Sequence, residues 1–345
     1  MGQGVHDGRG DDRPAEVGVA RPGRAGGHAG DPGPAAGTVT ASLRVQTVLY
    51  HSPPGQVRTW LDGVAAAVAQ ARRAGVVGTV EVCVGDCATP GLDAEEVDRL
   101  LEQAHQGGLG PLRYVPFGAN LGSAGGHNAL FALAPAPDLA LVLNPDALLS
   151  PQCLVGLVRA LEDPAVGIVE PRQIPLEHPK AYDPATGETS WAAGTCLVVR
   201  RAVIEATGGF DADTFFLYGD DVDLSWRARL AGWGIRHVPW AVVHHDKRLD
   251  AEGRQRTTDV EERYSAEAAL LLPWKYGRPD LLEERQRQFL ASGLPAHRAG
   301  IEAFHQRRAA ARLPAPVPGC EGVAHFVGNG YGHYRFSYPR GPQEA

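Results

Sequence analysis

The stretch Tyr218-Gly219-Asp220-Asp221-Val222-Asp223-Leu224-Ser225-Trp226-Arg227 places three carboxylates within four positions, at the start of a helical pattern. Apolar side chains then recur at helical spacing, and two glycines mark the end: Val222, Trp226, Leu230 and Trp233, with Gly232 and Gly234. The three acids therefore fall in the first turn of a predicted helix, where the positive end of the helix dipole stabilises negative charge.

This acidic turn has two interpretations. In the simpler one, an Asp caps the helix and stabilises it by about 1 kcal/mol. Capping needs one Asp, however, and carboxylates this close raise one another's pKa unless a cation or a proton donor lies beside them. We therefore predict that at least one of Asp220, Asp221 and Asp223 is catalytic.

The composition is that of an ordinary soluble protein. The chain has 345 residues, of which 43% are hydrophobic and 21% charged, and its net charge is −7. This balance argues against nucleic-acid binding. We find no apolar run of about 18 residues and no signal segment. We expect a cytoplasmic protein, with peripheral contact at the inner face of the membrane left open.

The cysteines are five in number and widely scattered: Cys83, Cys87, Cys153, Cys196 and Cys320. Such an odd, scattered set argues against a disulfide framework, and Cys83 and Cys87 have no second pair to complete a zinc site. We predict reduced and mostly buried thiols.

Strand and helix patterns alternate through the middle of the chain. We predict strands at 45–50, 79–84, 112–115, 139–143, 166–169, 195–199, 235–238 and 241–244, and helices at 57–74, 93–105, from 150 onward and at 201–207. Residues 172–192 are predicted to form a loop. This alternation is typical of an α/β fold with a parallel, doubly wound sheet.

The flanking regions differ in composition. Residues 1–42 are rich in Gly, Pro, Ala, Arg and Asp without periodicity, and we predict a disordered tail. The main domain is predicted at 43–250, a helical extension at 251–312 and an irregular tail at 313–345.

Two aspartates directly follow predicted strands. Ligands of an open parallel sheet bind beyond the carboxyl ends of its strands, where Asp86 and the run Asn144-Pro145-Asp146 fall. Mg²⁺ or Mn²⁺ takes one or two protein carboxylates and completes its shell with substrate phosphates. Asp146 is thus a metal ligand or a turn residue. Asp86 is either a turn residue or an acceptor for a base N–H or a ribose hydroxyl.

A glycine-rich turn runs through residues 120–128 into a helix, with Asn120, Gly122, Gly126 and Asn128 as its candidate ligand-binding residues. One interpretation is that the backbone N–H groups of this turn bind a nucleotide phosphate. The other is that its glycines allow close packing. His244 and His245 end a strand, so they point to opposite faces, and one of them is a candidate ligand for a metal or diphosphate.

Other residues are candidates for the acceptor side. Trp191 either stacks on a sugar ring or packs in the core. Lys247, Arg248 and the helix near Lys275 either meet an anionic lipid-linked acceptor or form a solvated basic face.

The order of these motifs resembles glycosyltransferase family 2, the inverting GT-A enzymes, and in particular their rhamnosyltransferase-like bacterial branch. The resemblance covers about residues 45–250 and rests on Asp86-Cys87-Ala88-Thr89, the turn at 120–128, Leu143-Asn144-Pro145-Asp146, Ala193-Gly194-Thr195, Arg200-Arg201, Gly208-Gly209-Phe210-Asp211, residues 216–224, Arg227, Gly232-Trp233 and residues 241–245. The sequence departs from the family pattern at Asp220, where a Glu is usual, at Cys87, where Asn is common, and at Leu49-Tyr50-His51.

The resemblance implies a role for each matching position. Asp221 would be the general base, with Asp220 and Asp223 beside it. Asp146 and His245 would hold a divalent metal, Mg²⁺ or Mn²⁺. The donor nucleotide would contact Asp86, Asn120, Gly122, Gly126, Asn128 and Asn144, and the acceptor would contact Trp191, Gly194 and Thr195.

The predicted function is transfer of a sugar from a nucleoside-diphosphate donor to a hydroxyl of a glycan or lipid-linked acceptor in bacterial polysaccharide or cell-wall synthesis. The alternative is a non-catalytic nucleotide-sugar-binding module or assembly partner. A dehydrogenase would need a glycine fingerprint after the first strand, where His51-Ser52-Pro53-Pro54 stands instead.

Overall fold

The computed structural model describes residues 40–177, 180–252, 255–328 and 330–331. The predicted tail at 1–42 lies outside the described residues except for its last three, and residues 329 and 332–345 of the predicted tail at 313–345 also lie outside them. None of the helices in the described ranges is both long and apolar enough to cross a membrane.

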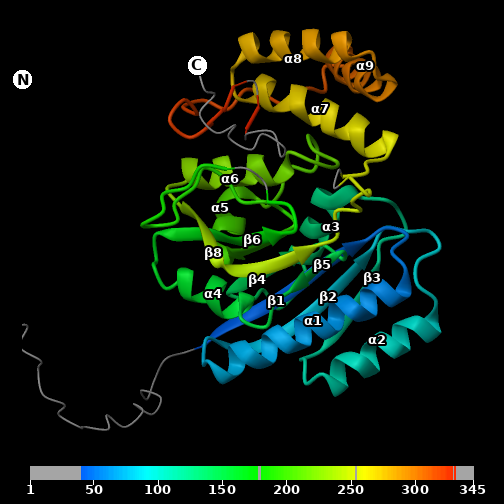
Figure 1. The fold of residues 1–345 in the computed structure, drawn as a ribbon, viewed down its shortest axis with the longest axis vertical. Coiled ribbons are helices and arrows are strands. Elements are labelled where there is room, and N and C mark those ends of the chain that lie inside the picture. Colours follow the sequence, from blue (N-terminus) through cyan, green and yellow to red (C-terminus); the bar gives the residue numbers. More distant parts are fainter. Residues whose placement is uncertain (1–39, 178–179, 253–254, 329, 332–345) are drawn as a thin grey trace, which may run out of the picture. The chain divides into compact units, whose positions relative to one another are not determined.

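An eight-stranded sheet forms the centre of the fold, in the order β3-β2-β1-β4-β7-β6-β8-β5 (Figure 1). Its strands are β1 (Ala41–Leu49), β2 (Val77–Asp86), β3 (Leu112–Pro116), β4 (Leu139–Leu143), β5 (Ala147–Leu149), β6 (Val166–Ile174), β7 (Cys196–Arg200) and β8 (Gly234–His245). Strands β3, β2, β1 and β4 pair in parallel with one another in that order, and β6 pairs in parallel with β8.

The α/β class predicted from the sequence is confirmed, but the sheet is mixed rather than parallel throughout. Strand β7 runs antiparallel to both β4 and β6, and β5 runs antiparallel to β8. The described residues of the link from β6 to β7 contain no helix, so the chain reverses without the crossover that a parallel pair requires. The two short strands predicted at 235–238 and 241–244 are one strand, β8, whose register with β6 shifts after Pro171.

Nine helices lie within the described residues. They are α1 (Pro54–Arg73), α2 (Ala94–Gln106), α3 (Gly122–Phe131), α4 (Cys153–Ala160), α5 (Arg201–Thr207), α6 (Asp220–Leu230), α7 (Asp259–Lys275), α8 (Pro279–Ser292) and α9 (Pro295–Ala309). The predicted helix start at Ser150 occurs three residues later, after a turn in which the Cys153 N–H donates to the Ser150 carbonyl.

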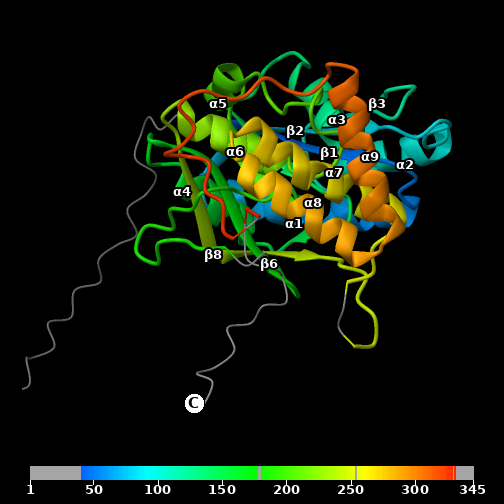
Figure 2. The same ribbon diagram turned by 90° about the horizontal axis from the view of Figure 1, so that it is seen from above.

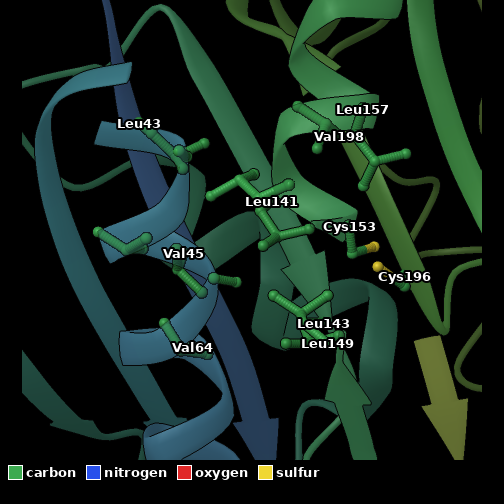
Figure 3. Close-up of a cluster of buried hydrophobic side chains, with 14 of the residues drawn as sticks. Leu43, Val45, Val64, Leu141, Leu143, Leu149, Cys153, Leu157, Cys196 and Val198 are labelled. Carbon is green, nitrogen blue, oxygen red and sulfur yellow. The ribbon is translucent and has the colours of Figure 1, made fainter. Parts of the chain in front are cut away.

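Strand β4 shows how the two faces of the sheet are covered. Leu139, Leu141 and Leu143 pack on one face with α1, α2 and α4, as Figure 3 shows for Leu141 and Leu143. Ala140 and Val142 pack on the other face with α3, α5 and α6. A strand buried on both faces explains the continuous apolar run in the sequence.

A third layer of helices lies on the outer side of α6 (Figures 1 and 2). Val222 and Trp226 of α6 share a cluster of buried side chains with α7, α8 and α9. Gly300 allows α9 to approach α7 closely, because a Cβ there would lie 2.6 Å from the Cβ of Ala266. Helix α6 is therefore enclosed between the sheet and the predicted helical extension.

Candidate active site

The end of β4 and the start of β7 meet at one edge of the sheet, since these antiparallel strands are neighbours. The Asn144 N–H donates to the Thr195 carbonyl at 2.8 Å, so the run at 144–146 lies beside Gly194 and Thr195. This hydrogen bond joins two motifs that the sequence separates by 50 positions.

Asp146 and His245 form a pair at this edge. Ala147 pairs with His245 across β5 and β8, and the His245 Nε2 lies 3.4 Å from Asp146 Oδ1. Burial alone would raise the pKa of Asp146, but its hydrogen bond with His245 and the charge of that imidazole hold the pKa below its usual value. His244 is exposed and His245 is buried, as predicted from strand alternation.

Two side chains orient the His245 ring from behind. Its Nδ1 lies 3.1 Å from Gln173 Oε1 and 3.4 Å from Thr195 Oγ1. If Nδ1 carries the proton and donates it to Gln173, Nε2 is unprotonated and its lone pair, on the side of Asp146, can bind a cation.

The Asp146–His245 pair fits a divalent cation that a substrate helps to bind. Asp146 Oδ1 is buried, and its contact with His245 Nε2 is long, at 3.4 Å, which leaves this carboxylate oxygen able to bind a cation. No group of three or more His, Cys, Asp or Glu side chains suited to a metal occurs in the described part of the chain. Mg²⁺ often takes only one or two protein ligands and leaves the rest to phosphates and water.

Asp221 lies on the other side of Gly194. Its Oδ2 accepts from the Gly194 N–H at 2.8 Å, and its Oδ1 accepts from the Val222 N–H at 2.8 Å. Burial raises the pKa of Asp221, and these two hydrogen bonds offset part of that effect. A carboxylate that holds its proton more readily than usual is suited to proton abstraction.

Two left-handed residues set the start of α6. Gly219 (φ +74°) precedes Asp220, and Tyr218 (φ +66°) precedes Gly219. Left-handed backbone is costly for a residue with a side chain, and such strain concentrates at functional sites. No side chain caps α6, so the Asp cap considered for this turn is not formed.

Asp220 is 6% exposed and lies in the first turn of α6. Burial raises its pKa strongly, and the neighbouring charge of Asp221 adds to the rise. Asp220 and Asp221 thus both hold a proton more readily than an exposed aspartate does.

Asp223 does not belong with the candidate catalytic groups, which corrects its place in the predicted set. Its side chain is fully buried and is bound by Lys275 Nζ at 2.5 Å, Arg227 Nε at 2.7 Å and the Tyr276 hydroxyl at 2.9 Å. Helical periodicity directs it toward α7 rather than toward Gly194. It links α6 to α7.

Asp86 ends β2 and is 2% exposed. Its oxygens accept from the N–H groups of Ala88 (2.8 Å) and Leu92 (3.0 Å) and from the Tyr114 hydroxyl (2.7 Å). Burial, followed by the hydrogen bond to Asp86, raises the pKa of Tyr114 to about 12. These contacts fit the turn-residue interpretation, and β1 separates Asp86 from the edge at Asn144.

Packing accounts for the candidate residues of the glycine-rich turn. Asn120 accepts from the Gly122 N–H, and a Cβ on Gly122 (φ +70°) would lie 2.3 Å from the Phe216 carbonyl oxygen. A Cβ on Gly126 would lie 2.7 Å from Val48. Asn128 accepts from the N–H of Phe210 and donates to its carbonyl. The turn thus holds α3 against β1 and the segment before α6.

Trp191 lies in the core, which contradicts the interpretation that its ring is open to a sugar. The residue is 2% exposed, with Lys180 Nζ 3.7 Å above its ring and Tyr331 packed edge-on. Lys247 and Lys275 are also buried, so neither forms a solvated basic face.

The polar side chains Glu170 and Gln173 of β6 were not predicted from the sequence. The apolar pattern predicted a strand ending at residue 169, with Gln173 in a loop, whereas β6 continues to Ile174 through its pairing with β8. The charged residue Glu170, directly after the apolar run at 166–169, was the sequence feature that could have indicated it.

Known glycosyltransferases are similar in sequence to parts of this chain. A family model described as glycosyl transferase family group 2 matches residues 180–288. The chain is 33% identical over 111 residues to N-acetylglucosaminyl-diphospho-decaprenol L-rhamnosyltransferase of Mycobacterium tuberculosis, covering 31% of this chain and 36% of that protein. It is 31% identical over 146 residues to the pre-mycofactocin glycosyltransferase of the same species, covering 37% and 30%.

The chain thus spans about a third of the length of these two relatives. Among solved structures, GalNAc-T7 with UDP, GalNAc and Mn²⁺ matches 81% of this chain and 60% of its own with a TM-score of 0.56, at 13% sequence identity. At that identity the likeness concerns the fold alone.

The fold is that of the GT-A glycosyltransferases. The chain is similar to the rhamnosyltransferases of glycosyltransferase family 2, and the family model matches its residues 180–288.

Proposed function

We propose that this protein is an inverting glycosyltransferase that moves a sugar from a nucleoside-diphosphate donor to a hydroxyl of a glycan or lipid-linked acceptor. The observation that carries the proposal is the meeting of three motifs at one sheet edge. Gly194 donates to Asp221, Thr195 lies beside His245, and His245 lies beside Asp146. A candidate base and a candidate diphosphate site thus flank the same dipeptide.

Asp221 would act as the general base. An acceptor hydroxyl is a weak nucleophile at neutral pH, so a carboxylate within hydrogen-bond reach takes its proton as the new bond forms. The acceptor oxygen bonds to the anomeric carbon while the bond from that carbon to the diphosphate oxygen breaks. The electron pair leaves with the nucleoside diphosphate, and attack from the opposite side inverts the anomeric configuration.

Asp146 and His245 are the residues that would hold a divalent cation, Mg²⁺ or Mn²⁺. When bound, such a cation neutralises charge that develops on the leaving diphosphate. The role of this chain is to present the Asp146 oxygen and the His245 Nε2 together, with Gln173 setting the ring orientation.

Donor turnover tests the proposal. Purified protein is incubated with a panel of nucleoside-diphosphate sugars and Mn²⁺ or Mg²⁺, with and without a diphospho-polyprenol-linked sugar as acceptor, and release of nucleoside diphosphate is measured. We expect one donor to be turned over and the product to have inverted configuration. Binding of a donor with no turnover under any condition would contradict the proposal and favour the non-catalytic module.

A further inference from the structure

A buried ion pair lies beneath the segment that touches Asp221. Lys180 Nζ contacts Glu170 Oε1, and their side chains are 3% and 1% exposed. Burial alone would raise the pKa of Glu170, but the charge of Lys180 and the hydrogen bonds to Glu170 hold that pKa below its usual value. Glu170 belongs to β6, whereas Lys180 comes from the connection between β6 and β7.

Glu170 Oε1 also lies 3.3 Å from His237 Nδ1, and the pair contacts the backbone of residues 191–193. Glu170 Oε2 accepts from the Ala193 N–H at 2.7 Å, and Lys180 Nζ donates to the Trp191 carbonyl at 3.0 Å. Lys180 also covers the Trp191 ring. The pair therefore fixes both ends of a three-residue backbone segment.

Helix α6 binds the same segment from the other side. The Ala192 N–H donates to Ser225 Oγ at 3.0 Å, and Ser225 Oγ donates to the Asp221 carbonyl at 2.8 Å. The Gly194 N–H then donates to Asp221 Oδ2. Three consecutive backbone N–H groups, at 192, 193 and 194, thus each have a side-chain acceptor, and the middle one is Glu170.

We propose that Glu170 and Lys180 are positioning residues for the base Asp221: they hold residues 191–193 so that the Gly194 N–H stays on the Asp221 carboxylate. This inference rests on the proposed function. Neither side chain touches a substrate, because both are buried, so each acts through the backbone. A base that is displaced by about 1 Å can lose on the order of 10²-fold in rate.

Stability alone does not explain this pair. A buried ion pair is a weak stabilising device, and replacing both partners together with uncharged groups of similar volume often leaves stability unchanged. If the pair instead maintains the geometry of Asp221, removing it should lower the rate of turnover. The double variant Glu170→Gln/Lys180→Met separates these explanations because it removes both charges of the pair together.

The matched control is Glu96→Gln/Arg58→Met. It makes the corresponding changes in an ion pair between α1 and α2, where Arg58 Nη1 lies 2.6 Å from Glu96 Oε2. Those helices cover the face of the sheet opposite α6 (Figure 1).

The first measurement needs no substrate. Hydrogen exchange of the Gly194 amide is followed by NMR in glycine-labelled protein, with Gly194→Ala to assign the signal. We expect Gly194 to exchange at least ~10-fold faster in the double variant and to be unchanged in the control. The conservative variant Lys180→Arg should keep the amide protected. Unchanged protection in a folded double variant would overturn the proposal.

The second measurement is kcat and KM for the donor found in the nucleotide-sugar panel. We expect kcat to fall at least ~10-fold with donor KM within about twofold of wild type. Wild-type kcat with altered Gly194 exchange would also overturn the proposal. If the double variant does not fold, Glu170→Asp withdraws the acceptor from the Ala193 N–H while keeping the charge, and the same two outcomes apply. Absence of wild-type turnover would contradict the proposed function alone, since the exchange measurement still decides whether the pair fixes Gly194.

Discussion

Asp223→Asn tests whether the third carboxylate of the acidic turn joins helices or takes part in catalysis. In the structure its carboxylate is fully buried against Lys275, Arg227 and Tyr276. Removing one charge from a buried ion pair costs about 3–5 kcal/mol, because its partner is left uncompensated. Asn keeps one acceptor oxygen, and Lys275 keeps its contact with Asp211 at 2.6 Å, so we place the loss near the lower end, at about 3 kcal/mol.

The assay is reversible urea unfolding, together with a thermal melt. A loss of about 3 kcal/mol corresponds to a fall in melting temperature of roughly 5 °C for a domain of this size. The matched control is Asp280→Asn, whose partner Arg278 is on the surface, and we expect no change in its melting temperature. At temperatures where Asp223→Asn is folded, donor turnover should be that of wild type. An unchanged melting temperature combined with lost turnover would refute the structural role and restore Asp223 to the catalytic set.

Three further predictions follow from individual contacts. Asp220→Asn should raise the melting temperature at neutral pH and have progressively less effect toward pH 4. The reason is that a carboxyl whose pKa is raised in the folded state destabilises the fold once the pH rises above the pKa it has in the unfolded chain. Thermal melts across pH 4–8 check this, and an effect that does not change with pH would contradict it. Gly122→Ala should destabilise the protein by more than the ~1 kcal/mol that left-handed backbone costs, because its Cβ would lie 2.3 Å from the Phe216 carbonyl oxygen. Gly108→Ala, whose Cβ would have no atom within 4 Å, should lower the stability by about that penalty alone. Equal urea midpoints for the two variants would contradict this prediction. Asp146→Asn should abolish any rise in melting temperature that Mn²⁺ gives in the presence of a nucleoside diphosphate, and a rise equal to that of wild type would rule out Asp146 as the ligand.

Much of the fold follows from local patterns in the sequence. The apolar run at residues 139–143 and the alternation of strands and helices were sufficient to predict an α/β sheet, since these features depend on burial on both faces. The reversal at β7 was not predictable in this way. It depends on a long connection whose Pro and Gly residues resemble any loop, and direction is fixed only when β7 pairs with β4.

The same contrast between local patterns and tertiary contacts applies to the candidate site. Asp146, Asp221 and His245 were predicted from the sequence because each lies near the start or the end of a recognisable element. Asp223, Trp191 and Lys275 have sequence environments that fit both a site and a core, and only their tertiary partners distinguish the two. Glu170 was missed because its partners, at 180 and 193, are distant in sequence and mostly backbone.

The most direct test of the central claim is donor turnover by Asp221→Asn beside wild type, with nucleotide-sugar affinity measured in parallel. Asn can still accept from the Gly194 or Val222 N–H but cannot take a proton from an acceptor hydroxyl at neutral pH. We predict that the variant binds the donor as wild type does and loses roughly 10²–10⁴-fold in kcat. Turnover at the wild-type rate with a hydroxyl acceptor would show that Asp221 is not the base.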